Sequence, residues 1–259
     1  MAQNARMCLL AVAWNTHPRW RLLLAGNRDE FHDRQATPLA RWTGPAGIVA
    51  GRDLQSGGTW AGMARGGRMA VVTNVRDPTV DKPGAPSRGA LVTAFLGSEE
   101  SASDHAARLL APAPDYAPFN LLLADGETCE YVGNTPAARR TRLAPGVHGL
   151  SNGDLDEPWP KVVMLQQRLG EWIASGDDDF EPFWAALADE TPADDAALPD
   201  TGVGLELERV LSPAFIRGPR YGTRASTLIA IDHDGRGWIA ERRFGPGGVF
   251  EGGTVLAVD

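Results

Sequence analysis

Residues 8–30, CLLAVAWNTHPRWRLLLAGNRDE, contain two short apolar segments followed by a charged tetrapeptide. Segments 8–14 and 20–26 each have the length and apolar content of a buried strand, and the Asn, Thr, His and Pro residues between them favour a turn. They predict an antiparallel hairpin. The tetrapeptide Asn27-Arg28-Asp29-Glu30 comes directly after the second segment, so we expect its charges and the Cys8 thiol to share one edge of a sheet.

The rest of the chain mixes strand and helix patterns. Apolar runs and turn residues predict strands at residues 59–64, 68–74, 120–124, 128–132, 226–232, 237–244 and 248–258. Helical periodicity predicts helices at residues 87–96, 101–110, 159–173 and 180–188. The acidic, proline-containing segment 189–204 is expected to be a mobile surface loop. Strands at both ends of the chain with helices between them indicate an α+β architecture.

The size and charge of the chain restrict its class. Its 259 residues are 43% hydrophobic and contain no linker rich in Gly, Ser or Pro, which predicts one domain over residues 1–259. The formal net charge of −8 argues against a nucleic-acid partner. No apolar run approaches the roughly 18 residues of a membrane span, and the first residues lack the features of a signal peptide. With only two cysteines, Cys8 and Cys129, the composition predicts a protein of the reducing cytoplasm.

Common nucleotide and metal motifs are missing from the sequence. It has no G-x-x-x-x-G-K-[ST] phosphate loop, no H-E-x-x-H zinc site and no G-x-S-x-G nucleophile elbow. The cysteines are too few, and too far from any suitable histidine spacing, for a structural zinc site. We therefore expect no metal site and no required cofactor.

A series of short blocks gives a more specific indication. The blocks are Asn27-Arg28-Asp29-Glu30, Gly57-Gly58-Thr59-Trp60, Thr73-Asn74, Ser87-Arg88-Gly89, Phe119-Asn120-Leu121, His148-Gly149-Leu150-Ser151-Asn152 and Tyr221-Gly222-Thr223-Arg224. The first is the tetrapeptide from which the NRDE family takes its name, and the others follow in the order of that family. The sequence is therefore identified as a member of the NRDE family, also called the transport and Golgi organisation protein two family.

The NRDE family is similar to the cysteine N-terminal-nucleophile hydrolases, which include penicillin V acylase and bile salt hydrolase. The resemblance implies a four-layer αββα sandwich, in which two stacked antiparallel sheets lie between layers of helices. Matched residue by residue, it implies a catalytic set of Cys8, Arg28, Asp29, Asn74, Asn152 and Arg224.

The resemblance also implies a role for most of these residues. Cys8 would be the nucleophile, with Arg28 and Asp29 against its thiolate and its α-amine. Asn152 would donate a hydrogen bond to the oxyanion, and Arg224 would be a second active-site arginine. The order Asn-Arg-Asp-Glu differs from the order in the hydrolases, which leaves the register of Arg28, Asp29 and Glu30 open by one residue.

Residues 1–7 precede Cys8, and this bears on the mechanism because the α-amine of an N-terminal cysteine serves as the base for its own thiol. Three alternatives are open. The chain could start at Met7, with that methionine then removed before Cys8. Self-cleavage could remove residues 1–7 as a propeptide. The segment could also stay, which would leave Cys8 without a free amine.

The sequence supports two classes of function and leaves open whether the protein is an enzyme. The first is a cysteine N-terminal-nucleophile amidohydrolase or acyltransferase that acts on a small amide or acyl compound. The second is a non-catalytic carrier, because members of the NRDE family have been linked to haem trafficking and to acyl-CoA or lipid metabolism. In both cases the partner is a small molecule, with haem as cargo in the second. Trp60 and His148 lie in family blocks and are the candidate ligand-binding residues.

Overall fold

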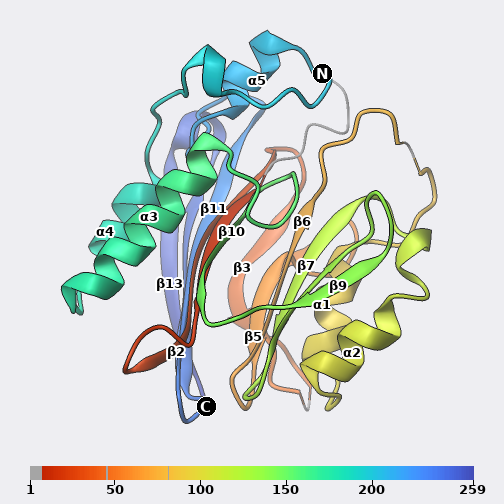
Figure 1. Ribbon diagram of the computed structural model, residues 1–259, viewed down its shortest axis with the longest axis vertical. Helices are drawn as coiled ribbons and strands as arrows, with labels where there is room; N and C mark the ends of the chain where they lie inside the picture. The colour runs from red at the N-terminus through yellow and green to blue at the C-terminus, as the bar shows by residue number, and fades with distance from the viewer. Residues whose placement is uncertain (1–7, 45, 81) are drawn as a thin grey trace.

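Two antiparallel sheets lie face to face between two layers of helices (Figure 1). This computed structural model describes residues 8–44, 46–80 and 82–259, and the predicted extra segment 1–7 lies outside them. The helices covering the first sheet are α3 (Pro160–Ser175) and α4 (Glu181–Leu187), and those covering the second are α1 (Gly89–Leu96) and α2 (Ala102–Leu109). The predicted α+β class and the four-layer αββα sandwich are therefore confirmed.

The first sheet has six strands and contains both ends of the described chain. In spatial order they are β10 (Gly146–Leu150), β1 (Cys8–Trp14), β2 (Trp20–Phe31), β11 (Tyr221–Asp232), β12 (Gly237–Phe244) and β13 (Phe250–Val258). The predicted hairpin forms β1 and β2, which pair antiparallel with Cys8 opposite Arg28. Because β2 pairs with β11 on its other side, the tetrapeptide lies in the middle of the sheet.

The second sheet has seven strands in sequence order. They are β3 (Ala36–Arg41), β4 (Val49–Asp53), β5 (Ala61–Ala64), β6 (Arg68–Asn74), β7 (Phe119–Ala124), β8 (Cys129–Gly133) and β9 (Arg139–Arg142). Sequential antiparallel strands can be joined by tight turns, such as the turn at Asp125, whose backbone N–H donates to the carbonyl of Thr128, whereas the connection from β6 to β7 contains α1 and α2.

Apolar side chains fill three layers of the sandwich. Along β1, Leu9 and Ala11 pack against α3 and α4, whereas Leu10 and Val12 enter the space between the sheets. Successive residues of a strand point to opposite faces, so a strand buried on both faces reads as an uninterrupted apolar run. The continuous run at residues 8–14 is therefore what a middle layer requires. A third layer lies between the second sheet and helices α1 and α2.

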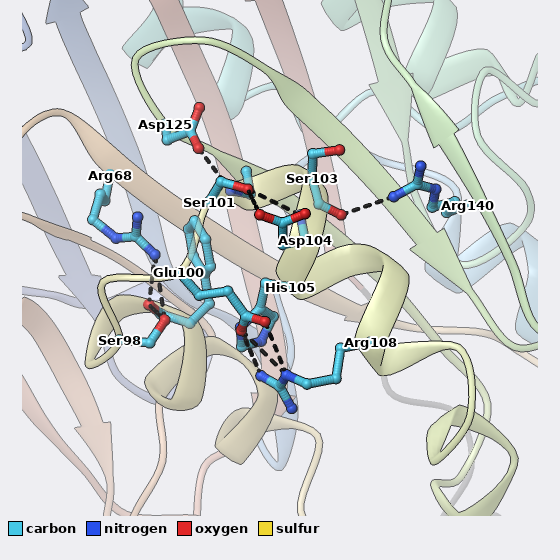
Figure 2. A network of polar contacts seen from close by, with 12 residues as sticks. Arg68, Ser98, Glu100, Ser101, Ser103, Asp104, His105, Arg108, Asp125 and Arg140 are labelled. Carbon is cyan, nitrogen blue, oxygen red and sulfur yellow. Dashed lines mark hydrogen bonds and ion pairs between the residues drawn. The ribbon is translucent and has the colours of Figure 1, made fainter.

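A polar network fixes the start of α2 against the second sheet (Figure 2). Ser101 caps the helix by accepting from the backbone N–H of Asp104, and Asp125 accepts the first backbone N–H of the helix. His105 is buried, with its Nδ1 2.9 Å from a carboxylate oxygen of Glu100. These contacts satisfy donors that a helix start otherwise leaves unpaired.

Two strands are longer than predicted, and this changes the setting of the family blocks. We expected the charged tetrapeptide to follow a strand ending at residue 26, but β2 continues to Phe31, so that expectation was wrong. Strand β11 likewise begins at Tyr221 rather than at residue 226. Each extension pairs with the other, from Tyr221 opposite Phe31 onward. These strand extensions contain polar residues whose side chains hydrogen-bond to distant parts of the chain. No local apolar pattern therefore marks the extensions as strands.

Other elements escaped prediction because they lack a local apolar pattern. Strands β3 and β9 are outer strands of the second sheet with several exposed residues, and β9 is the sequence RRTR. The remaining unpredicted elements are β4, β10, the short helix α5 (Leu205–Leu211) and three 3-10 turns, Ala113–Asp115, Asp195–Ala197 and Pro246–Gly248. None of the helices formed by the described residues is long and apolar enough to cross a membrane.

Candidate active site

A cavity of about 390 Å³ opens beside Cys8, where β1 begins and β6 ends. Its lining includes Cys8, Arg28, Asp29 and Asn74, together with Trp60. These residues come from both sheets and are far apart in the sequence, so the stacking of the sheets creates the cavity. Most of the remaining lining is polar, and the walls carry both cationic and anionic side chains.

Asn152 ties the first sheet to the second beside this cavity. Its Oδ1 accepts from the backbone nitrogen of Cys8 at 3.1 Å, and its Nδ2 donates to the backbone carbonyl of Asn74 at 2.7 Å. The neighbouring Ser151 hydroxyl donates to the carbonyl of Cys8 at 2.7 Å. The backbone of Cys8 is therefore fixed on both sides of its α-carbon, and the predicted asparagines lie close to it.

The Cys8 thiol faces the space between the sheets, since it is two residues before Leu10 on the same face of β1. The residue as a whole is half-buried, but burial of its thiol raises the pKa to about 12. The negative charge of Asp29 raises this pKa further, and the charge of Arg28 opposes both. A thiol with this pKa is protonated at neutral pH, so it needs a base beside it to become a nucleophile.

The tetrapeptide presents its side chains alternately to the two faces of β2. Asn27 donates to the carbonyls of Leu187 and Ala214, on the side of the helices. Asp29 lies on that face as well, where the Thr223 hydroxyl donates to it at 2.6 Å. Arg28 is opposite Cys8 and lies on the cavity side. Arg28 therefore shares the face of the thiol, whereas the Asp29 carboxylate accepts its hydrogen bond on the other face.

Arg28 is held rigidly in the cavity wall. It is 7% exposed, its guanidinium lies 4.5 Å from the centre of the Trp60 ring, and Asp53 is 3.6 Å away. Asp53 is also bound by Arg34 at 2.5 Å, so one carboxylate joins two arginines. Stacking and ion pairing both order a planar guanidinium. Arg28 is therefore a fixed positive charge close to the thiol.

Lys161 is a buried residue of this region that sequence reasoning missed. It lies at the start of α3, is 5% exposed, and donates to the carbonyl of Leu211 at 2.9 Å. Burial lowers its pKa and the nearby Asp29 raises it, while burial raises the pKa of Asp29 and Lys161 lowers it. Oδ2 of Asp29 is buried and has no hydrogen-bond partner among the described residues. Two buried titratable groups that shift each other's pKa thus lie behind Cys8.

A signal for Lys161 was present in the sequence. Lys161, Leu165 and Leu169 are spaced at four-residue intervals, so the lysine belongs to the buried face of the helix predicted over 159–173. A lysine on the apolar face of a helix requires a partner. Neither the carbonyl of Leu211, to which Lys161 donates, nor the nearby charge of Asp29 is identifiable from the helix pattern.

Two glycine-containing blocks meet at the cavity rim. A Cβ atom on Gly58 would lie 2.5 Å from the backbone of Gly89, so only glycine permits this approach. The backbone N–H of Thr59 donates to the carbonyl of Gly89 at 3.3 Å. The same contact positions Trp60, whose ring leaves no room for a side chain at Gly51. The blocks Gly57-Gly58-Thr59-Trp60 and Ser87-Arg88-Gly89 are therefore in direct contact. Their separation in the sequence gave no sign of this contact.

Residues 7–246 match the family model described as Transport and Golgi organisation 2. The chain belongs to the Transport and Golgi organisation 2 family. A curated relative, the Transport and Golgi organization protein 2 homolog of Bos taurus, is 32% identical over 256 residues, which cover 91% of this chain and 92% of the relative. The matched region includes every predicted site residue.

Solved hydrolase structures share the fold of this Transport and Golgi organisation 2 family member. The Caenorhabditis elegans N-acylethanolamine-hydrolyzing acid amidase ortholog aligns with a TM-score of 0.54 and 13% identity over 86% of this chain and 92% of that chain. The conjugated bile acid hydrolase of Clostridium perfringens aligns with a TM-score of 0.54 and 11% identity over 98% of this chain and 92% of that chain. The likeness to the N-terminal-nucleophile hydrolases therefore holds for the fold.

Three of the predicted site residues are not part of the cavity lining in this family member: Asn152, which binds the backbone of Cys8 beside the cavity, Arg224 and His148. Arg224 is the extra residue of a bulge in β11, between Thr223 and Ala225. Its guanidinium donates to four backbone carbonyls, those of Phe31, His32, Arg34 and Phe244. It lines a smaller pocket on the other side of Trp60 and Arg28, so its visible contacts are with the backbone beyond β2.

His148 also lies outside the cavity lining. On β10 it lies opposite Val12, and its two ring nitrogens are 2.9 Å from Asp156 and 3.0 Å from the carbonyl of Ala144. In this family member the ring is thus engaged by its own neighbours. In the described part of the chain, no three His, Cys, Asp or Glu side chains are grouped to hold a metal ion.

The pair of His148 and Asp156 predicts a pH-dependent contribution to stability. The hydrogen bond from Asp156 raises the pKa of His148 above 6.5, its unfolded value. The contribution is therefore complete below that value and is lost as the pH rises through the folded pKa. We expect His148→Gln to lower the melting temperature by up to about 4 °C near pH 5.5 and by less near pH 9. Melting by circular dichroism across this range checks the prediction, and Asp156→Asn should remove the same pH dependence.

Proposed function

We propose that the protein is a cysteine amidohydrolase or acyltransferase that acts on small amide or acyl compounds, with Cys8 as its nucleophile. The observation that carries the proposal is the position of Cys8, whose backbone nitrogen is held by Asn152 at 3.1 Å and whose thiol lies at the wall of the cavity. A nucleophile and a candidate base nitrogen on one residue meet the geometric requirement of this chemistry.

The proposed base is the α-amine of Cys8 after residues 1–7 are removed. An amide nitrogen carries no basic lone pair, whereas a free amine in the same place keeps Oδ1 of Asn152 as an acceptor. Once protonated, the amine would also place a positive charge next to the thiolate, in addition to Arg28. Both effects would lower the pKa of a thiol that burial now raises to about 12.

Asn74 is the proposed donor to the oxyanion that forms when the thiolate attacks a carbonyl. It lines the cavity, and its side-chain amide makes no hydrogen bond to another described residue, whereas Asn152 already donates to the Asn74 carbonyl. An unengaged amide in a fixed position can stabilise developing negative charge. The hydrolase activities named for the structural neighbours, on N-acylethanolamines and conjugated bile acids, support this class of reaction.

The deciding prediction concerns the N-terminus. A chain beginning at Cys8, released from a cleavable leader, is expected to hydrolyse members of a panel of simple amides and activated acyl esters. The matched control begins with one glycine before Cys8 and should be slower by roughly 100- to 10,000-fold, because its α-amine is displaced from the thiol. Intact mass identifies each N-terminus, including that of protein expressed from its own start. Equal rates for the two chains would refute the role of the amine.

A second candidate function is that of a small-ligand carrier, because in a chain that keeps residues 1–7 Cys8 has no free α-amine to act as the base for its thiol. We infer that in this state the cavity would hold haem or an acyl-CoA or lipid ligand without reaction. Among the described lining residues, Cys8 is the only one of a type that commonly ligates haem iron. A Soret band that appears on haem titration and is lost in Cys8→Ala would support carriage. An unchanged spectrum in that variant would exclude ligation by Cys8.

A further inference from the structure

A small apolar hollow lies directly beneath Cys8, between the two sheets. Its volume is about 20 Å³, and Cys8, Arg28 and Trp60 belong to both this hollow and the polar cavity. A site of that volume holds about one water molecule or a methyl-sized group. The thiol therefore stands between a large polar space and a small apolar one.

Gly26 lines the hollow on β2. On the cavity face of β2, Gly26 lies between Leu24 and Arg28, and its neighbours across the sheet are Leu10 on β1 and Thr227 on β11. Each of the other positions in this row carries a side chain. Residue 26 lies one step along the face from the Cys8–Arg28 pair, and a Cβ atom there would lie 2.9 Å from the carbonyl oxygen of Leu9, so the close approach of β1 at this wall of the hollow requires glycine.

The far wall of the hollow is closed by packed side chains. Leu10, Leu24 and Val71 are 1%, 3% and 7% exposed and belong to the apolar layer between the sheets, as does Ala61. Such a layer is packed at nearly crystalline density, so it does not admit an extended chain without a change in side-chain volume. The hollow is thus a short, blind extension of the site.

The two spaces suit the two parts of a substrate. In acyl transfer the acyl group stays bonded to the thiol sulfur, whereas the leaving group must depart and water or another acceptor must enter. The open cavity allows this exchange, and its polar wall matches an amine or alcohol leaving group. The blind apolar hollow suits the part that remains.

We propose that this hollow receives the acyl substituent of the substrate and limits it to about two or three carbons. This assignment rests on the proposed function of Cys8. The thiolate forms a C–S bond to the carbonyl carbon, the C–N or C–O bond breaks, and the leaving group takes the proton released by the thiol. Water then cleaves the thioester, giving the carboxylic acid and the free thiol. Acyl groups longer than propionyl would have to displace Leu24 or Val71.

The test is a ladder of p-nitrophenyl esters from acetate to octanoate. It uses both the full chain and the same protein with residues 1–7 removed. We expect acetate and propionate to give the highest kcat/KM and hexanoate to be at least about 10-fold lower, since a poorly accommodated methylene costs that much in a pocket. Intact mass after rapid quenching identifies the acyl group on Cys8. A flat ladder, or one that rises with chain length, would overturn the proposal.

A variant that enlarges the hollow makes the test specific. Val71→Ala should raise the ratio of kcat/KM for hexanoate over acetate by about 10-fold or more. The matched control is Val49→Ala, which truncates another valine of the same apolar layer that does not line the hollow, and its ratio should equal that of the wild type. Circular dichroism melting shows that both variants fold. An equal shift in both variants would contradict the assignment.

Failure of the two proposals is distinguishable. If no ester in the ladder acylates Cys8 in either form of the protein, then the proposed nucleophile is wrong and the hollow has no acyl group to receive. If Cys8 is acylated equally by short and long esters, the nucleophile stands and the size limit is wrong.

Discussion

Replacement of Cys8 by alanine is expected to lower turnover by the chain that begins at residue 8 by about 1,000-fold or more, which is effectively to background. The reason is that the thiol is the proposed nucleophile, and the nearby side chains can only stabilise charge around a reaction that it begins. Burst kinetics with an activated ester, together with the mass of the trapped acyl-enzyme, measure the effect. In Cys8→Ala the burst and the adduct should both disappear.

Cys129 provides the matched control for this experiment. It is the other cysteine of the chain and is fully buried in β8, where burial raises its pKa well above the usual range. Cys129→Ala should therefore keep the burst amplitude and the adduct on Cys8. If activity survived in Cys8→Ala but was lost in Cys129→Ala, the reactive sulfur would be that of Cys129. The proposed site around Cys8 would then have no basis.

Removal of one partner of the buried ion pair between Arg76 and Glu208 is expected to cost about 3–5 kcal/mol of unfolding free energy. The two side chains are 1% and 4% exposed, and the Arg76 guanidinium donates directly to the Glu208 carboxylate. Burial lowers the pKa of Arg76 even with Glu208 beside it, which shows how strongly this region disfavours an uncompensated charge. Arg76→Met should lower the melting temperature by roughly 6–20 °C.

Two comparisons separate the charge effect from a loss of packing. The double variant Arg76→Met, Glu208→Leu leaves no uncompensated charge and should recover most of the stability, because apolar pairs of similar volume are tolerated at such sites. The exposed pair of Arg168 and Glu171 supplies the surface control, and Arg168→Ala should not measurably change the melting temperature. A double variant as unstable as Arg76→Met alone would show that packing dominates.

The buried pair is also connected to the candidate site. The backbone N–H of Arg76 donates to the carbonyl of Asn152 at 2.7 Å, and Asn152 in turn binds the backbone of Cys8. Glu208 is on α5 and also accepts from the backbone and the hydroxyl of Thr201. The pair therefore fastens the segment around α5 to the strand that ends at Asn74. In variants that lack either Arg76 or Glu208, we therefore expect the unfolding transition to include the segment around α5 and the end of β6.

Much of the fold was predictable because it depends on local periodicity. The apolar runs at residues 8–14 and 20–26 predicted the hairpin β1–β2, and the four predicted helices correspond to α1, α2, α3 and α4. Buried strands and amphipathic helices leave this signal wherever a whole face is apolar. Strands with mixed exposure, such as β3 and β9, leave none, so they were found only in the structure.

The candidate site was predictable where a residue is part of a family block and lies close to a strand end. Cys8, Arg28, Asn74 and Asn152 were placed together by the resemblance, and the structure brings them within one network of contacts around the cavity. Arg224 and His148 were chosen on the same grounds but bind backbone and neighbouring groups elsewhere. A residue that lies in a family block can make its contacts locally. Its presence in the block does not say which cavity its side chain faces.

The sequence by itself determined the family, the hairpin that begins at Cys8 and the separation of strand-forming from helix-forming segments. These depend on the order of residue types within short windows. The tertiary structure alone decided that Arg28 faces the thiol while Asp29 faces Thr223, that Lys161 lies behind the site, and that Gly26 lines a hollow beneath it. The physical reason is that strand register, bulges and buried charge pairs are set by contacts between residues far apart in the chain, which no local pattern contains.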